Sequence, residues 1–158
     1  MRGADVLVRM LTEYDVNVIF GVPGDTNVPV YGALEDASDR IRHVMARDER
    51  SAGFMADAYA RVCNKSGVFE CPSGAGAMYS LPGVAEANAS SAPVILFTSD
   101  TPLPGEGRGV ITELDCAKLF EPVTKASILV KAPEKLPEVV RRAFRIATTG
   151  RPRRGPRG

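Results

Sequence analysis

Short apolar runs alternate along this chain with longer segments in which apolar residues recur every three or four positions. The short runs predict strands at residues 16–20, 41–45, 67–71, 93–98 and 126–130. The longer segments predict helices at residues 4–14, 27–37, 49–62, 77–89, 113–119 and 133–148. This alternation is typical of right-handed βαβ units. The expected fold is therefore α/β: a three-layer, doubly wound, mostly parallel sheet with helices on both faces.

Composition fits a soluble globular protein with one domain, which we expect to span residues 1–150. The chain has 158 residues, of which 44% are hydrophobic and 25% are charged, and its net charge is +1. This balance gives no overall electrostatic reason to expect a nucleic acid or a membrane as partner. Residues 151–158 differ, because they carry four arginines and no acidic residue. We expect them to form a basic disordered tail, with nucleic-acid binding as a minor alternative.

Several classes of protein are disfavoured by the same reading. The three cysteines form no CxxC pair and His43 is the one histidine, so we expect neither a disulfide framework nor a metal site in this chain. Charged residues interrupt the apolar pattern at the N-terminus, which argues against a signal peptide. No apolar run approaches the length of a membrane span. We expect a cytoplasmic protein without a membrane partner.

Candidate chemistry lies in three strand-to-helix turns, at residues 21–24, 47–49 and 73–76. In a parallel sheet these turns share one edge, where open α/β folds bind ligands. Two of the turns are rich in glycine, which permits close approach of a ligand to the backbone. The third offers the carboxylate of Glu49 at the start of a helix. Two plainer interpretations stay open: tight βα turns for the glycines, and a solvated charge cluster for residues 47–50.

The helix that follows Glu49 has a well-defined apolar face. Residues at i, i+3, i+4, i+7 and i+8 spacing supply it: Ala52, Met55, Ala56, Tyr59 and Ala60. A carboxylate at such a strand–helix junction can be partly buried, and burial makes a carboxylate chemically useful.

The order of these motifs resembles the N-terminal, pyrimidine-binding domain of thiamine-diphosphate enzymes of the acetolactate synthase and pyruvate decarboxylase superfamily. The similarity runs from Gly3 to about Pro152. The pieces that carry it are Val18-Ile-Phe-Gly-Val-Pro-Gly24, the stretch from Arg47 to Arg61, Ser73-Gly-Ala-Gly-Ala77, Ala92-Pro-Val-Ile-Leu96, Glu113-Leu-Asp115 and Pro122-Val-Thr-Lys125.

The resemblance implies a role for each of these turns. Glu49 would be the catalytic residue, hydrogen-bonded to N1′ of the aminopyrimidine ring of thiamine diphosphate, and an elevated pKa would help it. The residues expected to line the cofactor site are Val22, Pro23, Gly24, Glu49, Ser73, Gly74 and Gly76. The reaction implied is the decarboxylation of a 2-keto acid followed by transfer or release of the product. This chain has Ala75, Met78-Tyr79 and Ile111-Thr112 where family members often have Pro, Thr-Asn and Phe-Gln, so its substrate is left open.

The family's second half is missing from this sequence. Its diphosphate-binding domain carries a Gly-Asp-Gly…Asn motif, which does not occur here. We therefore expect thiamine diphosphate to be shared with a separate domain or subunit that carries Mg²⁺, and the isolated chain to be inactive. The resemblance also implies a homodimer or higher oligomer.

Several origins of such a half-enzyme stay open. The chain could be a separate alpha-type subunit of a two-subunit 2-keto acid decarboxylase. It could be a truncated enzyme in which residues 153–158 are read out of frame. It could also be a non-catalytic binding or assembly module that kept the fold.

Overall fold

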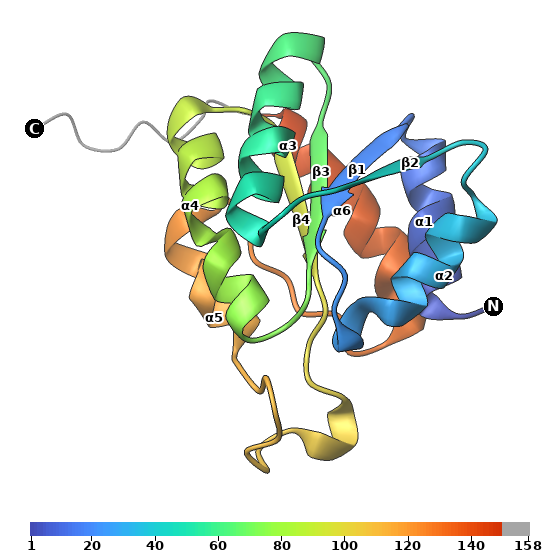
Figure 1. The fold of residues 1–158 in the computed structure, drawn as a ribbon, viewed down its shortest axis with the longest axis vertical. Coiled ribbons are helices and arrows are strands. Elements are labelled where there is room, and N and C mark those ends of the chain that lie inside the picture. The colour runs from blue at the N-terminus through green and yellow to red at the C-terminus, as the bar shows by residue number, and fades with distance from the viewer. Residues whose placement is uncertain (150–158) are drawn as a thin grey trace, which may run out of the picture.

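The computed structural model describes residues 1–149, which fold into a parallel sheet with helices on both faces (Figure 1). Four strands pair in the order β2-β1-β3-β4. Their bounds are β1 (Val18–Gly21), β2 (Arg42–Met45), β3 (Gly67–Cys71) and β4 (Val94–Thr98). The helices are α1 (Gly3–Glu13), α2 (Val28–Asp36), α3 (Glu49–Cys63), α4 (Ala75–Ser90), α5 (Cys116–Phe120) and α6 (Leu136–Thr148). The tail predicted at residues 151–158 lies outside the described residues.

Two apolar cores lie on opposite faces of the sheet. Successive strand residues point to opposite faces, so Ile19 and Val68 join one core while Phe20 and Phe69 join the other. Helices α1, α2 and α6 pack on the first core, and α3, α4 and α5 pack on the second (Figure 1). The prediction of a three-layer, doubly wound α/β fold is confirmed.

Helices α3 and α4 approach each other very closely, which corrects one detail of the predicted apolar face. A Cβ on Gly83 would lie only 2.6 Å from the Cα of Gly53. The buried seam of α3 therefore follows its small residues, including Ala52, Ala56 and Ala60. Met55 was expected on this face, but it lies off the seam and is 38% exposed.

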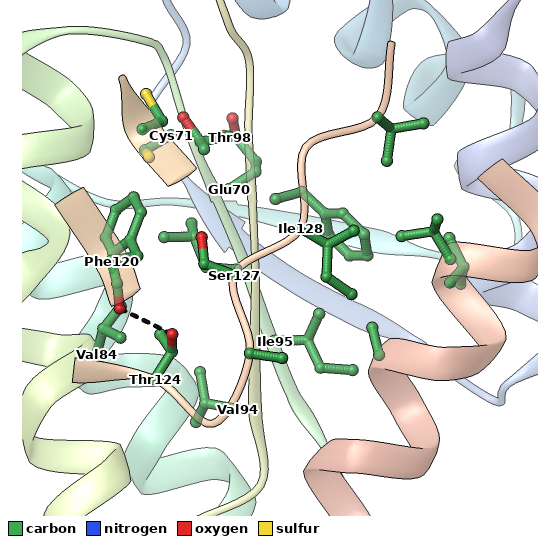
Figure 2. Close-up of a pocket in the computed structure, with 18 of the residues that line it drawn as sticks. Glu70, Cys71, Val84, Val94, Ile95, Thr98, Phe120, Thr124, Ser127 and Ile128 are labelled. Atoms are coloured by element: carbon green, nitrogen blue, oxygen red, sulfur yellow. Dashed lines mark hydrogen bonds between the residues drawn. The ribbon is translucent and has the colours of Figure 1, made fainter. Parts of the chain in front are cut away.

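The strand predicted at residues 126–130 does not form. Within residues 1–149, no backbone hydrogen bond joins this segment to β4, the nearest sheet edge. A cavity of about 510 Å³ is lined both by this segment and by β4 (Figure 2). An apolar run becomes a strand only when its backbone finds a partner, and none is in reach here.

None of the helices in residues 1–149 has the length and apolar character needed to span a membrane.

Candidate functional site

The three predicted turns meet at the carboxyl edge of the sheet. Gly21 at the end of β1 is in register with Met45 of β2 and with Glu70 of β3. The turns that follow these strands therefore start from neighbouring points. A Cβ on Gly24 would lie 2.7 Å from the Cβ of Pro72, so the first and third turns are in direct contact.

Glu49 is the first residue of α3, and its carboxylate is left free by its neighbour. Asp48 caps the helix: its carboxylate accepts hydrogen bonds from the backbone N–H and the hydroxyl of Ser51, both at 3.0 Å. Asp48 also faces Arg50, at 3.3 Å. The half-buried Glu49 forms no hydrogen bond or ion pair with any residue of the part that the structure describes. No described residue therefore uses this carboxylate to hold the fold.

Gly76 lies directly beside that carboxylate, at a position where no side chain fits. A Cβ at this position would lie 2.9 Å from Oε1 of Glu49 and 2.6 Å from Cγ of Pro72. Gly74 has a φ of +67°, a left-handed conformation, and a Cβ there would lie 2.8 Å from that of Thr112. Both glycines are therefore fixed by geometry, which is a stronger requirement than a tight turn alone.

Ser73 connects the third turn to two other segments. It is 2% exposed, and its backbone N–H donates to Oγ1 of Thr26 at 3.1 Å. Its hydroxyl lies 2.8 Å from that of Thr112. The Ser73 side chain thus holds the turn in place. Of the other predicted residues, Val22 is half-buried against the α3 core and Pro23 is exposed at the rim.

A second carboxylate, Glu70 of β3, lies at the same edge and was not predicted. It is 2% exposed and accepts hydrogen bonds from Nδ2 of Asn27 and from the hydroxyl of Tyr31. Nε2 of His43 lies 3.6 Å from Glu70 Oε1 and 3.1 Å from the Tyr31 hydroxyl. Burial, reinforced by the hydrogen bond to Glu70, raises the pKa of Tyr31.

This buried cluster positions the first turn. Asn27 stands at the N-cap position of α2, but its side chain makes no capping hydrogen bond to that helix. Its Oδ1 accepts from the N–H of Gly24 at 2.7 Å, and its Nδ2 also donates to the carbonyl of Val22 at 3.3 Å. Glu70 therefore anchors Asn27, and Asn27 fixes the turn that holds Val22, Pro23 and Gly24.

The sequence did contain a signal for Glu70. It is the one charged residue in the run Gly67-Val-Phe-Glu-Cys71, and every residue of that strand is buried. A charged group in a strand buried on both faces requires polar partners. Its neighbour Cys71 has a pKa raised to about 12, chiefly by burial.

Comparisons with known proteins identify the family of this chain. A family model described as "Thiamine pyrophosphate enzyme, N-terminal TPP binding domain" matches residues 1–119. The chain belongs to this family of thiamine-diphosphate enzymes, as their N-terminal domain.

Three similar proteins are all named as acetolactate synthase subunits. The chain is 42% identical over 152 residues to a "Probable acetolactate synthase large subunit" of Methanocaldococcus jannaschii. It is 39% identical over 150 residues to "Acetolactate synthase isozyme 1 large subunit" of Escherichia coli. It is 36% identical over 152 residues to "Acetolactate synthase catalytic subunit, mitochondrial" of Saccharomyces cerevisiae. These alignments cover 95–96% of the chain but only 25%, 26% and 22% of the relatives, so the chain spans about a quarter of their length.

The residues present fit the cofactor that the family implies. A planar ring with a basic nitrogen needs a group at its edge that donates or shares a proton, and a backbone that it can approach closely. The unpaired Glu49 carboxyl supplies the first, and the bare glycine backbone at Gly76, beside that carboxyl, supplies the second. Within residues 1–149 no three His, Cys, Asp or Glu side chains are grouped so that they could hold a metal ion.

Proposed function

We propose that this chain is the pyrimidine-binding half of a thiamine-diphosphate-dependent enzyme of the acetolactate synthase type, acting on 2-keto acids. The observation that carries the proposal is the placement of Glu49: its carboxylate has no hydrogen-bond partner among residues 1–149 and lies beside Gly76, a position where no side chain fits. The names of the relatives support the reaction type, because the similarity covers nearly the whole chain.

Each part of the site would have its own task. Thiamine diphosphate, when bound, supplies the carbanion stabilisation that decarboxylation of a 2-keto acid requires. The Glu49 carboxyl would donate a hydrogen bond to the ring nitrogen N1′, or share its proton with it. Val22 would line the site of the ring, and Gly74 and Gly76 would let the ring lie close to the backbone. Ser73 would keep the third turn in place through Thr112.

The proposed half-site is incomplete alone. The diphosphate and its Mg²⁺ would be bound by a diphosphate-binding domain or subunit outside residues 1–158. The pure chain would then bind thiamine diphosphate weakly and show no turnover. Measurable decarboxylation of a 2-keto acid by the pure chain would contradict this part of the proposal.

We also propose that the working form is a cytoplasmic homodimer or higher oligomer. Large apolar side chains are exposed on neighbouring helices in the single chain: Phe54 and Met55 of α3, and Met78 and Tyr79 of α4. Exposed apolar surface of this kind favours association.

The test is a chimera in which residues 1–149 replace the matching N-terminal region of the Escherichia coli relative. We expect it to form acetolactate from pyruvate when thiamine diphosphate and Mg²⁺ are added. Glu49→Gln should lower kcat by about 10²–10⁴-fold, the usual contribution of a positioned acid–base group. The matched control, Glu35→Gln, changes an exposed residue of α2 and should leave kcat unchanged. Equal kcat values for the two variants would refute the proposal.

A further inference from the structure

The amino edge of the sheet, opposite the edge that carries Glu49, borders a second cavity of about 380 Å³, which we call the amino-edge cavity. Asn17, which directly precedes β1, and Ser66, which directly precedes β3, both line it. Small-molecule sites in proteins usually have volumes of about 300–1,000 Å³. None of the residues predicted to bind thiamine diphosphate lines this cavity, so it is separate from the proposed pyrimidine site.

Three segments that are distant in sequence meet around the amino-edge cavity (Figure 1). The first is the connection from α1 to β1, residues 14–18. The second is the end of α3 with the residues that follow it, and the third is α6. Helix α6 packs on one face of the sheet and α3 on the other, so both helical layers contribute to the cavity.

Positive charge dominates the lining of this cavity. Lys65, Arg141 and Arg145 line it, whereas Asp15 is the one acidic residue that does so among residues 1–149. No described residue forms an ion pair with any of the three cations, and residues 150–158 contain no acidic side chain. Cationic side chains grouped in a concave site attract anions, and arginine in particular binds phosphate through paired N–H groups.

Helix α6 holds two of these cations close together. Arg141 and Arg145 are four residues apart, so they lie on one face of the helix, where like charges destabilise it. Glu138, about one turn before Arg141, faces Lys135 instead, at 3.6 Å. Attraction to the negative end of the helix accounts for Arg145 in the last turn, but this effect does not extend back to Arg141. An anion bound between the two arginines would offset their repulsion.

An aromatic ring stands beside these charges. Tyr14 lines the cavity and stacks on Phe144, with ring centroids 4.2 Å apart and an angle of 6° between the ring planes. Phe144 is 5% exposed and belongs to the core beneath α6, whereas Tyr14 is 37% exposed. One face of the Tyr14 ring is therefore covered, and the other is available to stack a planar ring of a ligand.

We propose that the amino-edge cavity binds a nucleoside di- or triphosphate. The base stacks on the uncovered face of Tyr14, and Lys65, Arg141 and Arg145 bind the phosphate groups. An inorganic phosphate or diphosphate would engage the cations but leave Tyr14 unused. No residue of the proposed pyrimidine site takes part, so this binding is independent of the proposed function.

Calorimetric titration of the 158-residue chain with ADP tests the proposal. We expect a Kd below about 1 mM at about 0.1 M ionic strength, where exposed charges more than about 10 Å apart are largely screened. Pyrophosphate has the two phosphate groups without the base. It should bind about tenfold more weakly than ADP, because it lacks the stacking on Tyr14.

Two neighbouring arginines give a matched pair of variants. Arg141→Gln removes a cation from the cavity and should raise the Kd for ADP about tenfold. Arg142→Gln makes the same change in net charge at a residue that does not line the cavity, so the Kd should stay unchanged. Both side chains are exposed on α6, so neither substitution should unfold the chain.

Amide NMR signals report where ADP binds. The signals of Asn17 and Ser66 should shift during the titration, whereas those of Gly24 and Gly76, at the carboxyl edge, should not. Any of four results would overturn the proposal: no binding at about 5 mM ADP, equal Kd values for the two arginine variants, shifts confined to the carboxyl edge, or pyrophosphate binding as tightly as ADP. The last result would indicate a phosphate site that does not recognise a base.

Discussion

Glu49 and Glu70 stand at the same edge of the sheet, yet they differ in burial and in hydrogen bonding. Glu70 is 2% exposed, and Asn27 and Tyr31 both donate hydrogen bonds to it. Glu49 is half-buried and has no hydrogen-bond donor among residues 1–149, because Asp48 takes the capping role beside it.

The comparison separates a carboxylate that holds the fold of the turns, Glu70, from one that no described residue uses, Glu49. A buried charge is tolerated only when its partners are already in place, and Glu70 has them in Asn27 and Tyr31. A half-exposed carboxylate opposite a glycine keeps its capacity for a ligand. A bound ring would use Glu49, whereas Glu70 would act at a distance by holding the turn at residues 21–24.

The largest expected difference in stability comes from the glycine beside each glutamate. A Cβ on Gly21 would overlap the enclosed Glu70 carboxylate, so Gly21→Ala should destabilise the chain by on the order of 3 kcal/mol. A Cβ on Gly76 would lie 2.9 Å from a Glu49 oxygen that can rotate away, although Pro72 must also shift. Gly76→Ala should therefore cost less stability, while placing a methyl group beside the Glu49 carboxyl that we propose binds the ring. Urea unfolding of both variants measures the difference, and equal losses would contradict the comparison.

A smaller difference is expected when the glutamates themselves are changed. Glu70→Leu leaves Asn27 and Tyr31 without their acceptor and should reduce the free energy of unfolding by about 1–3 kcal/mol. Glu70→Gln keeps the shape and one acceptor, so its loss should be smaller. Glu49→Gln should change stability by less than about 0.5 kcal/mol, because no described residue depends on that carboxylate. A Glu49 variant that unfolds as easily as Glu70→Leu would mean that Glu49 is structural.

The smallest effect should appear only at high pH. An unfolded tyrosine ionises near pH 10, whereas burial and the hydrogen bond to Glu70 raise the pKa of Tyr31 in the folded chain. Above about pH 10 the unfolded chain therefore loses this proton first, and the stability contributed by Tyr31 falls as the pH rises. Tyr31→Phe should flatten this alkaline loss of stability. The exposed Tyr79→Phe should not, and identical pH profiles for the two variants would contradict the assignment.

Much of this molecule was predictable because local patterns and parallel topology determine it. β3 was predicted with its observed bounds, and α3 begins at Glu49 as its pattern indicates. Parallel strands bring their carboxyl ends to one edge, which was enough to predict that the turns at residues 21–24, 47–49 and 73–76 meet.

What sequence patterns missed depends on partners distant in the chain. Asn27 has the residue type and position of a helix cap, but its side chain turns to Glu70, 43 residues away. No local pattern distinguishes these two uses of an asparagine. Segment 126–130 has the composition of a strand but lacks a backbone partner within the described residues.

The most direct test of the proposed role of Glu49 is a crystal structure of the chimera with thiamine diphosphate bound. We predict that the Glu49 carboxylate lies within about 2.6–3.2 Å of N1′ of the aminopyrimidine ring, the range of a working hydrogen bond. We also predict that Gly74 and Gly76 lie against that ring, and that Glu70 stays bonded to Asn27 and Tyr31. A ring bound elsewhere, or one whose N1′ is hydrogen-bonded to a different residue, would contradict the account.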